Sequence, residues 1–322
     1  MRIGLIDVDG HKYPNLALMK LSAWHKAQGD DVCMVKLPTL EHYDKVYVSK
    51  VFGDEYSTMP DLYLNADEVV YGGTGFAITV ENGKEVYHKE LDKPLPYEIE
   101  HMYPDYSLYP ELTKDTAYGY LTRGCCNNCS FCIVSKKEGM CSTKVADLSE
   151  FWRDQKRIEL MDPNILACRD RLDLIRQLAE SNAKVNFNQG LDARFINEET
   201  AKALAKVNIY RVHFAFDFMK NEQAIIKGLK TFQRFCPIDS RNATVYMLTN
   251  YDTTIQEDIY RVKMIKECGF QPDVRIYRKK SAPRSVKDLQ RWCNNRFIYR
   301  SCELEDYVPR KDGKTFKELY MK

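Results

Sequence analysis

The feature that most constrains the fold is a regular alternation of short apolar segments with amphipathic segments between Tyr118 and Tyr277. Gly269 and Pro272 give a clear stop signal after the last amphipathic segment. The strand candidates are residues 118–122, 158–161, 185–188, 212–216, 244–248 and 274–277. The helix candidates between them are residues 147–155, 170–180, 198–205, 222–235 and 255–268. This rhythm predicts an α/β fold with a parallel sheet, whose ligands collect at the carboxyl ends of the strands.

A shorter alternation of the same kind occupies the first part of the chain. Its strand candidates are residues 3–8, 31–35, 45–51 and 68–71, and residues 16–28 have the spacing of an amphipathic helix. The pattern predicts a small, doubly wound, Rossmann-like domain over residues 1–87. Asp9, His11 and the Gly72–Gly75 turn each follow a strand candidate, so we expect them at the ligand-binding edge of this domain.

Two further segments complete the predicted organisation. Residues 88–116 are rich in proline and tyrosine without a sustained period, which is typical of a linker between domains. Residues 282–322 form a C-terminal extension with one more helix candidate, residues 286–294, followed by basic and aromatic residues.

Three cysteines lie close together in the stretch GYLTRGCCNNCSFCIV, which begins at Gly119. Cys125, Cys129 and Cys132 have the spacing C-x3-C-x2-C. Three thiolates on one tight loop can hold three irons of a [4Fe–4S] cube, whose usual complement is four cysteines. A cube held in this way has one iron that is open to a ligand other than protein.

Other interpretations of these cysteines are less consistent with the sequence. A bacterial ferredoxin run that starts at Cys126 would need its fourth cysteine at the position of Lys136. A zinc site needs a second pair of ligands, and only Cys141 lies nearby, without a histidine. Cysteines packed this tightly in a long chain indicate metal binding or catalysis rather than a disulfide scaffold.

The cysteine spacing, the preceding strand and the aromatic Phe131 resemble the signature of the radical S-adenosylmethionine (radical SAM) superfamily. The motifs LTRGC, IVSKKEG and NQGLDAR are similar to those of radical SAM proteins from phages and bacteria. The resemblance implies a partial (β/α)6 barrel over residues 117–281. It also implies that S-adenosylmethionine binds the open iron and is reductively cleaved to a 5′-deoxyadenosyl radical, which takes a hydrogen atom from an unidentified substrate. An electron donor such as flavodoxin or ferredoxin is implied as a partner.

The resemblance also suggests roles for polar residues that follow the strand candidates. The implied cofactor-binding residues are Phe131, Asp162, Asn164, Asn188, Gln189 and Arg194. The substrate candidates are Asp217, Thr249, Asn250 and Asp252. An ordinary turn at Asn164 and a loop salt bridge between Asp192 and Arg194 are the structural alternatives.

The N-terminal segment is similar to the cobalamin-binding domains that precede the radical core in some radical SAM methyltransferases. Asp9-x-His11 resembles the element that supplies a histidine to cobalt, with Pro14 where that element has glycine. The possible cobalamin residues are Asp9, His11, Gly73 and Thr74. A cobalamin-dependent radical methyltransferase is therefore an alternative function, and a turn or capping role is the alternative for His11.

Charge is distributed unevenly along a chain whose formal net charge is +2. Residues 1–117 contain 11 Lys/Arg and 20 Asp/Glu, and residues 261–300 contain 12 Lys/Arg and 3 Asp/Glu. The basic end could bind nucleic acid, or it could consist of solvated helix faces. A non-catalytic metal-cluster module that binds nucleic acid is thus a third hypothesis. No apolar run approaches the length of a membrane span, and we expect a cytoplasmic protein.

Overall fold

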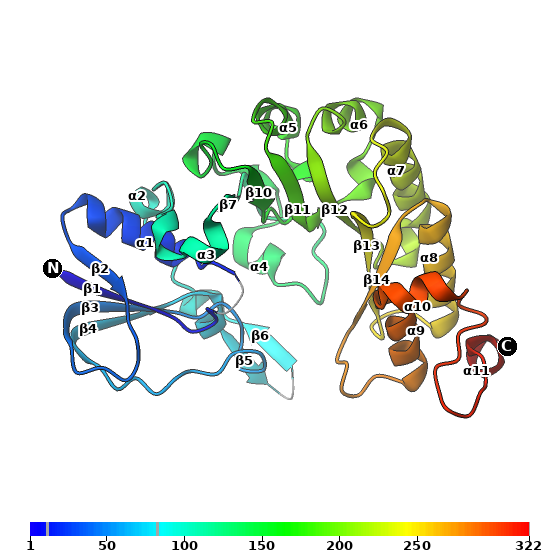
Figure 1. Ribbon diagram of the computed structural model, residues 1–322, viewed down its shortest axis with the longest axis horizontal. Helices are drawn as coiled ribbons and strands as arrows, with labels where there is room; N and C mark the ends of the chain where they lie inside the picture. The colour runs from blue at the N-terminus through cyan, green and yellow to red at the C-terminus, as the bar shows by residue number, and fades with distance from the viewer. Residues whose placement is uncertain (11–12, 82–83, 322) are drawn as a thin grey trace. The chain divides into compact units, whose positions relative to one another are not determined.

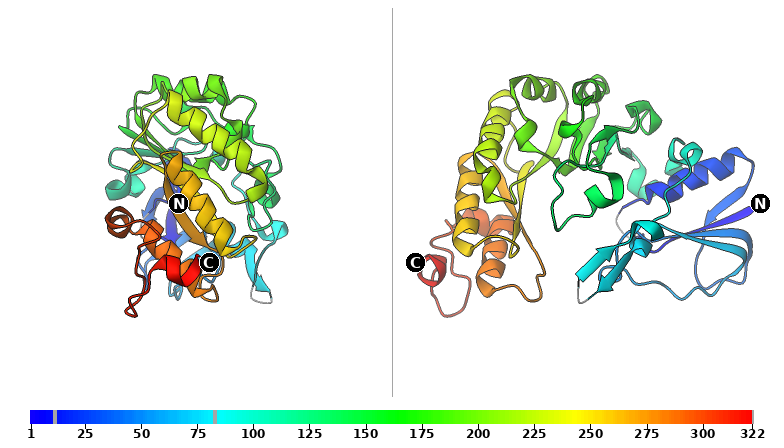
Figure 2. Two further views of the ribbon diagram at one scale, coloured as in Figure 1. Left: turned by 90° about the vertical axis from the view of Figure 1, so that its right-hand side faces the viewer. Right: turned by 180° about the vertical axis from the view of Figure 1, so that it is seen from behind.

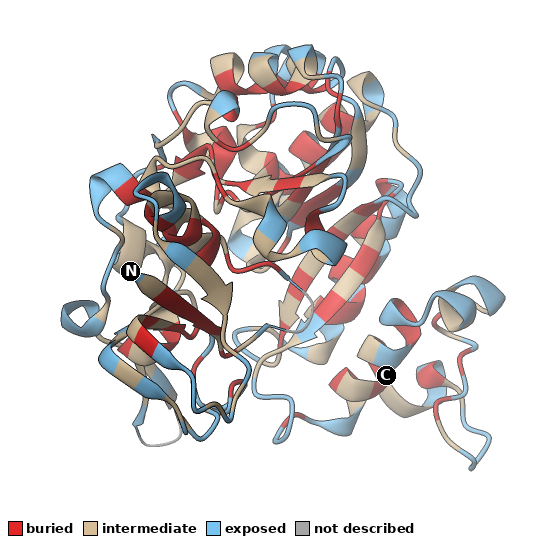
Figure 3. Cartoon of the chain, turned by 60° about the vertical axis from the view of Figure 1, so that its left-hand side comes forward, coloured by how far each residue is buried: buried red, intermediate tan, exposed pale blue. Residues whose placement is uncertain are grey.

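The computed structural model describes residues 1–10, 13–81 and 84–321, and the fold belongs to the α/β class with parallel sheets (Figure 1). The chain divides into two compact units, Met1–Glu159 and Leu160–Lys322. Both units have apolar strands packed against other elements, and the buried residues, red in Figure 3, line the strands of both sheets. No helix among the described residues is both long enough and apolar enough to cross a membrane.

The first sheet has four parallel strands in the order β2-β1-β3-β4. Its strands are β1 (Arg2–Asp7), β2 (Asp31–Met34), β3 (His42–Ser49) and β4 (Asn65–Gly72). The crossover from β1 to β2 is the helix α1 (Leu16–Ala27), which begins at Asn15, whose side chain accepts a hydrogen bond from the backbone N–H of Leu18. In this order β1 lies next to β3, although the two strands are not consecutive in the chain. Open α/β sheets bind ligands at the carboxyl ends of such a pair of strands.

The two faces of this sheet are covered in different ways. One face packs on α1 and on residues of the 88–116 segment, through a cluster that contains Ile3, Leu5, Leu18 and Ile99. The other face is covered by residues between the strands, including Leu37, Met59, Leu62 and Leu64. Residues 35–41 and 50–64, which connect β2 to β3 and β3 to β4, contain no helix. A parallel sheet is therefore confirmed, whereas the second helical layer of the predicted doubly wound domain is not found among the described residues.

Short elements follow in the rest of the first unit. The 88–116 segment contains brief helical turns rather than one regular element, and it packs on the N-terminal sheet through Ile99 and Leu108. The elements are η1 (Thr74–Ala77), β5 (Ile78–Glu81), β6 (Lys84–Tyr87), η2 (Lys89–Leu91), α2 (Tyr97–Glu100), η3 (Tyr106–Leu108), α3 (Pro110–Thr113), β7 (Thr116–Gly119), β8 (Thr122–Arg123), α4 (Val134–Glu138), β9 (Thr143–Lys144), η4 (Leu148–Glu150) and β10 (Arg157–Leu160).

The second sheet has six strands in the order β14-β13-β12-β11-β10-β7, and the pairs from β11 to β14 are parallel. The remaining strands are β11 (Lys184–Leu191), β12 (Ile209–Ala215), β13 (Ala243–Thr249) and β14 (Gln271–Ile276). Between them lie η5 (Ile165–Ala167), α5 (Arg171–Glu180), η6 (Ala193–Phe195), α6 (Glu198–Leu204), η7 (Met219–Asn221), α7 (Glu222–Phe235) and α8 (Ile255–Glu267). The predicted helix over residues 147–155 is wrong, because only the turn η4 forms there. Six strands agree with the expected count, but the sheet order by itself does not establish the barrel that the resemblance implies.

The helix α9 (Arg284–Asn294) ends the second sheet by bonding to its last strand. The side chain of Asn294 accepts from the backbone N–H of Val274 at 2.9 Å and donates to the Val274 carbonyl at 3.0 Å. The Gln290 amide donates to the same carbonyl at 2.9 Å. Two side chains of α9 thus satisfy backbone groups of β14 that a further strand would otherwise pair with. Beyond α9 lie α10 (Arg296–Ser301) and α11 (Phe316–Tyr320), and Figure 2 shows the same elements from two further sides.

Candidate metal centre and strand-end residues

The three cysteines of the C-x3-C-x2-C motif lie in a loop that a short strand pair closes. β8 pairs antiparallel with β9, so that Thr122 lies opposite Lys144 and Arg123 lies opposite Thr143. The backbone N–H of Cys125 donates to the carbonyl of Gly139 at 3.1 Å, just beyond α4. The loop therefore returns to its own start.

Gly124 makes the turn that directs the chain from β8 into the cysteines. Its φ is +86°, and a Cβ atom built on it would lie 2.1 Å from the carbonyl oxygen of Cys141. A side chain at this position would both require the left-handed region and collide with backbone, so only glycine fits without displacement.

A half-buried polar contact that the sequence did not predict holds the start of the loop. The Glu138 carboxylate, at the end of α4, accepts from Arg123 Nη1 at 2.9 Å and from the Gly124 N–H at 3.1 Å. Arg123 Nη2 donates to Glu100 at 3.3 Å, and its guanidinium lies 4.0 Å from the centre of the Tyr120 ring. Burial acts to lower the pKa of Arg123, but the neighbouring Tyr120, Glu100 and Glu138 outweigh it and the pKa is raised. Arg123 is therefore a charged residue held between two carboxylates directly beside the cysteine loop.

The thiols of the motif differ from the neighbouring cysteines in their exposure. Cys125, Cys129 and Cys132 are half-buried, whereas Cys126 and Cys141 are exposed. The N–H of Cys132 donates to the carbonyl of Cys129 at 2.9 Å, which fixes the last two cysteines on one tight turn. Three thiols on a closed loop fit soft-metal or iron–sulfur chemistry in the donor atoms they offer. Phe131, the predicted cofactor neighbour, lies half-buried on the same turn.

The N-terminal residues considered for cobalamin are bonded to protein groups in the first unit. The Asp9 carboxylate accepts from the backbone N–H of Val51 at 2.6 Å and from the Ser57 hydroxyl. The Thr74 hydroxyl accepts from Lys137 Nζ at 2.6 Å, which ties the glycine turn to α4. A Cβ atom on Gly73 would lie 2.3 Å from the carbonyl oxygen of Lys50, so this glycine serves a close backbone approach within the protein. His11 lies outside the described residues.

Three of the residues that follow β10 and β11 lie together in the second unit. The Asn164 side chain donates to Asp192 at 3.3 Å, and Asp192 accepts from Arg194 Nε at 2.9 Å and Nη2 at 2.6 Å. The salt bridge considered from the sequence is thus present, and Asp192 orients Arg194. Asp162 and Asn164 are buried.

β11 is irregular where the two predicted carboxamides lie. Its register with β12 shifts between Phe187 and Leu191, and Gly190 within the shift has a φ of +102°. Asn188 is half-buried and Gln189 is exposed. Bulges of this kind bend a strand and re-aim its side chains, and they are common next to functional sites.

The substrate candidates at the ends of β12 and β13 differ in their surroundings. Asp217 accepts from the Leu248 N–H at 2.8 Å, and burial raises the pKa of this carboxyl. The Thr249 hydroxyl donates to the carbonyl of Arg275 at 3.2 Å, and the Asn250 amide donates to the carbonyl of Tyr277 at 2.8 Å. Asp252 is exposed. Asp217, Thr249 and Asn250 therefore bond to neighbouring strand ends, while Asp252 is on the surface.

A second unpredicted residue, Arg261 of α8, holds the same strand ends from within. Its side chain is fully buried and donates to the carbonyls of Phe216 (2.6 Å) and Leu248 (2.9 Å). It also forms an ion pair with the fully buried Asp258 at 2.5 Å. The carboxyl ends of β12 and β13 are thus attached to one buried ion pair, for which the amphipathic pattern of the helix gives no signal.

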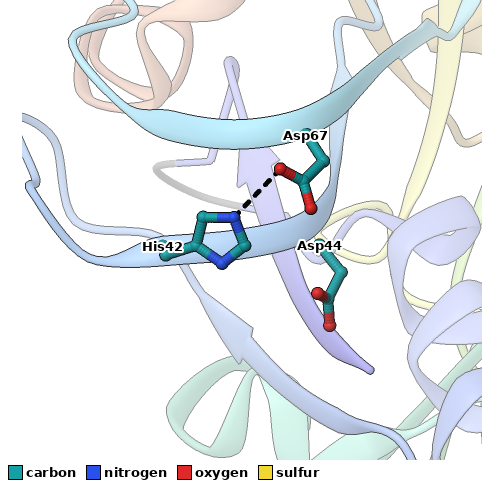
Figure 4. Close-up of side chains that lie close together, drawn as sticks. All are labelled: His42, Asp44 and Asp67. Atoms are coloured by element: carbon teal, nitrogen blue, oxygen red, sulfur yellow. Dashed lines mark hydrogen bonds and ion pairs between the residues drawn. The ribbon is translucent and has the colours of Figure 1, made fainter.

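A separate group of possible metal ligands lies at the start of β3 and β4 (Figure 4). His42, Asp44 and Asp67 each place a ligand atom within 4.8 Å of the others. His42 Nε2 and Asp67 Oδ1 are 3.0 Å apart, and both side chains are mostly exposed. A hydrogen bond between His42 Nε2 and Asp67 explains the proximity of these two side chains without an ion.

No protein-family model matches the chain, and no curated protein matches it.

Proposed function

We propose that the chain is a radical SAM enzyme that cleaves S-adenosylmethionine at a [4Fe–4S] cluster and acts on a substrate bound at the strand ends. The observation that carries the proposal is the C-x3-C-x2-C loop, with its three half-buried thiols and its closure by β8, β9 and Glu138. Such a donor set can hold three irons of the cube. When bound, the cluster would supply one electron to the sulfonium of S-adenosylmethionine, which releases methionine and a 5′-deoxyadenosyl radical.

In this proposal the protein holds and orients the reactants, while the cofactor supplies the difficult chemistry. Cys125, Cys129 and Cys132 are the cluster ligands. Gly124 and Glu138 fix the loop from which those ligands project. The cofactor is assigned to polar groups near the strand ends, with Asp192 holding Arg194 in place. These cofactor residues are Phe131, Asp162, Asn164, Asn188, Gln189 and Arg194.

The proposal does not include a corrinoid, because Asp9 and Thr74 are bonded to protein groups and Gly73 lies against backbone. The substrate is assigned to the region of Asp217, Thr249, Asn250 and Asp252. A flavodoxin- or ferredoxin-like protein is proposed as the electron donor.

The test uses anaerobically reconstituted and dithionite-reduced full-length protein. Iron and sulfide are quantified, and 5′-deoxyadenosine is measured after addition of S-adenosylmethionine. We expect about four irons per chain and a cleavage product in the wild type. Both should be lost in Cys129→Ala and retained in Cys126→Ala, because Cys126 is exposed and outside the motif.

Three results would contradict the proposal. The first is zinc in place of iron, which would favour a structural metal module. The second is a well-formed cluster that never cleaves S-adenosylmethionine, and the third is equal cluster loss in the Cys126→Ala control.

A further inference from the structure

The strands β12, β13 and β14 have one face buried under helices and one polar face. Val212, Phe214, Val245, Met247 and Val274 are fully buried. Phe214 packs against Phe232 of α7 at a ring-centre distance of 5.0 Å, so this face is the one that the helices cover. Figures 1 and 2 show α7 and α8 along one side of these strands.

The opposite face carries the residues that alternate with these apolar ones. On it lie Arg211 and His213 of β12, Thr244 and Tyr246 of β13, and Asp273 and Arg275 of β14. Both arginines are exposed, and Thr244 and Tyr246 are half-buried. We refer to this set of six residues as the polar sheet face.

Three planar groups are stacked on the polar sheet face. The rings of His213 and Tyr246 are parallel within 9°, and their centres are 4.8 Å apart. The Arg275 guanidinium lies 4.8 Å from the centre of the Tyr246 ring. The register explains the stack: His213 pairs with Thr244 and Arg275 with Leu248, so they approach Tyr246 from the strands on its two sides. The last plane of the stack is an exposed guanidinium.

Hydrogen bonds fix the two outer members of the stack, His213 and Arg275. The imidazole Nδ1 of His213 bonds to the Thr244 hydroxyl. Arg275 donates through Nε at 2.9 Å and Nη2 at 3.1 Å to the two oxygens of Asp273. Asp273 in turn accepts from the Asn294 amide at 3.1 Å. The stack is therefore held in place before any ligand arrives, which lowers the entropic cost of binding.

The charge of the polar sheet face is positive. Asp273 is the one acidic residue in β12, β13 and β14, and it already bonds to Arg275. Arg211 takes part in none of the ion pairs found among the described residues of these strands, and its side chain is exposed. Burial, together with the charges of Arg211 and Arg275, lowers the pKa of His213 to about 4. His213 is thus neutral near pH 7, and the two guanidiniums supply the positive charge.

We infer that the polar sheet face binds a single-stranded nucleic acid, in which the phosphate of one nucleotide contacts Arg211 and the base of another stacks on Arg275. Arg211 and Arg275 belong to the strands on opposite sides of Tyr246, so the two contacts require more than one nucleotide. A guanidinium matches phosphate geometry through its planar set of donors and also stacks on aromatic faces. Nucleobases offer a flat π-surface to such a plane, whereas simple carboxylates and inorganic anions do not. This inference names the substrate class of the proposed function, and the role of the bound ligand as a substrate rests on that function. Binding itself needs no turnover.

The test measures binding of a fluorescein-labelled, mixed-sequence, single-stranded 12-mer to the full chain by anisotropy, with saturating S-adenosylmethionine present. Mononucleotides and inorganic phosphate are added as competitors, and full displacement of the 12-mer by a mononucleotide at equal concentration would contradict binding of a strand. We expect Arg211→Gln to weaken binding about tenfold or more, as the loss of a charge-assisted contact requires. For a strand, the slope of log K against log salt should fall by about 0.7.

Two variants of the stack separate charge from shape. Arg275→Gln should weaken binding of the 12-mer, and Arg275→Lys should rescue little of it, because lysine keeps the charge but lacks the plane. Full rescue by lysine would contradict the stacking role. Circular dichroism of each variant confirms that it is folded.

A charge-matched control lies on the helix-covered side of the same unit. Lys227 and Lys230 of α7 line an open groove of about 560 Å³ together with Arg234. The double variants Lys227→Gln/Lys230→Gln and Arg211→Gln/Arg275→Gln each remove two positive charges. The lysine variant should leave the affinity for the 12-mer within about twofold of wild type, because surface charges at a distance are screened. Loss of binding in the lysine variant alone, or no binding of any probe, would overturn the inference. Because S-adenosylmethionine cleavage is measured separately, that result would leave the proposed function standing.

Discussion

The contact of Glu138 with the start of the cysteine loop gives a quantitative prediction. Glu138→Gln keeps the shape of the side chain but removes its charge. Arg123 Nη1 and the Gly124 N–H both donate to the carboxylate, so one of them would face the NH2 group of the glutamine and lose its hydrogen bond. Hydrogen bonds to charged groups contribute about 1.5–3 kcal/mol each. The side chains of Arg123 and Glu138 are only 28% and 11% exposed, so water screens the pair weakly. Because Arg123 keeps its contact with Glu100, we expect a loss of about 2–3 kcal/mol, below the cost of breaking a fully buried pair.

The assay is thermal unfolding of the metal-free protein, followed by iron content after reconstitution. For a unit of this size the loss corresponds to a decrease of about 5–10 °C in the unfolding midpoint, and we expect less bound iron because the loop start is no longer fixed. The control is Glu180→Gln, which removes a carboxylate from the exposed Arg176–Glu180 pair. Such surface pairs contribute about 0–1 kcal/mol. A Glu138→Gln protein with the stability of this control and the iron content of the wild type would refute the reasoning.

Three further predictions concern other positions. Gly124→Ala should prevent cluster loading even where the protein folds, because φ is +86° and the added Cβ would meet the Cys141 carbonyl; unchanged iron content would contradict this. Asp258→Asn should lower the free energy of unfolding by about 3–5 kcal/mol, because it leaves a fully buried arginine uncompensated; a shift of under 1 kcal/mol in urea unfolding would oppose this. His213 has a folded-state pKa of about 4, below its usual 6.5, so the unfolded chain takes up the proton first. Stability should therefore fall by up to about 3 kcal/mol as the pH drops from about 6.5 to 4, and urea midpoints at pH 7 and pH 4.5 should differ less in His213→Gln.

The elements with a strong local signal could be predicted from the sequence. α7 runs from Glu222 to Phe235, as the apolar spacing predicts, and α8 begins at Ile255 after a capping box formed by Thr254 and Glu257. Each strand predicted between residues 185 and 277 is present with shifts of a few residues at its ends. Periodicity and caps act within a few residues of each other, which is why they are visible in the sequence.

The failed helix prediction at residues 147–155 shows that side-chain hydrogen bonds and tertiary contacts can override a local helical pattern. Trp152 Nε1 donates to the carbonyl of Gln155 at 2.8 Å, and the Gln155 side chain accepts from the Arg153 N–H at 2.9 Å. These bonds occupy backbone groups that a helix would use. Phe151 is buried directly beneath Gly119, a tertiary contact that no pattern within the segment reveals.

The candidate site was predictable only in the part that depends on spacing. The cysteines were found because a cluster needs its thiolates on one loop, and the Asp192–Arg194 bond was considered because its members are two residues apart. Glu138 reaches Gly124 only through the closure of the whole loop, and Arg261 reaches Phe216 from a different element. Such long-range polar contacts depend on the tertiary fold and leave no local pattern.

The capping of β14 by α9 has a consequence for how this edge of the sheet meets other chains. Because Gln290 and Asn294 occupy backbone groups of Val274, a further strand has no partner at this position and the sheet is terminated there. The same amides prevent the edge of β14 from pairing with a strand of another chain, which is one route to aggregation. With β14 closed to further strands on this side, the second sheet, in the described part of the chain, is an open sheet that ends at α9 and not a ring of paired strands.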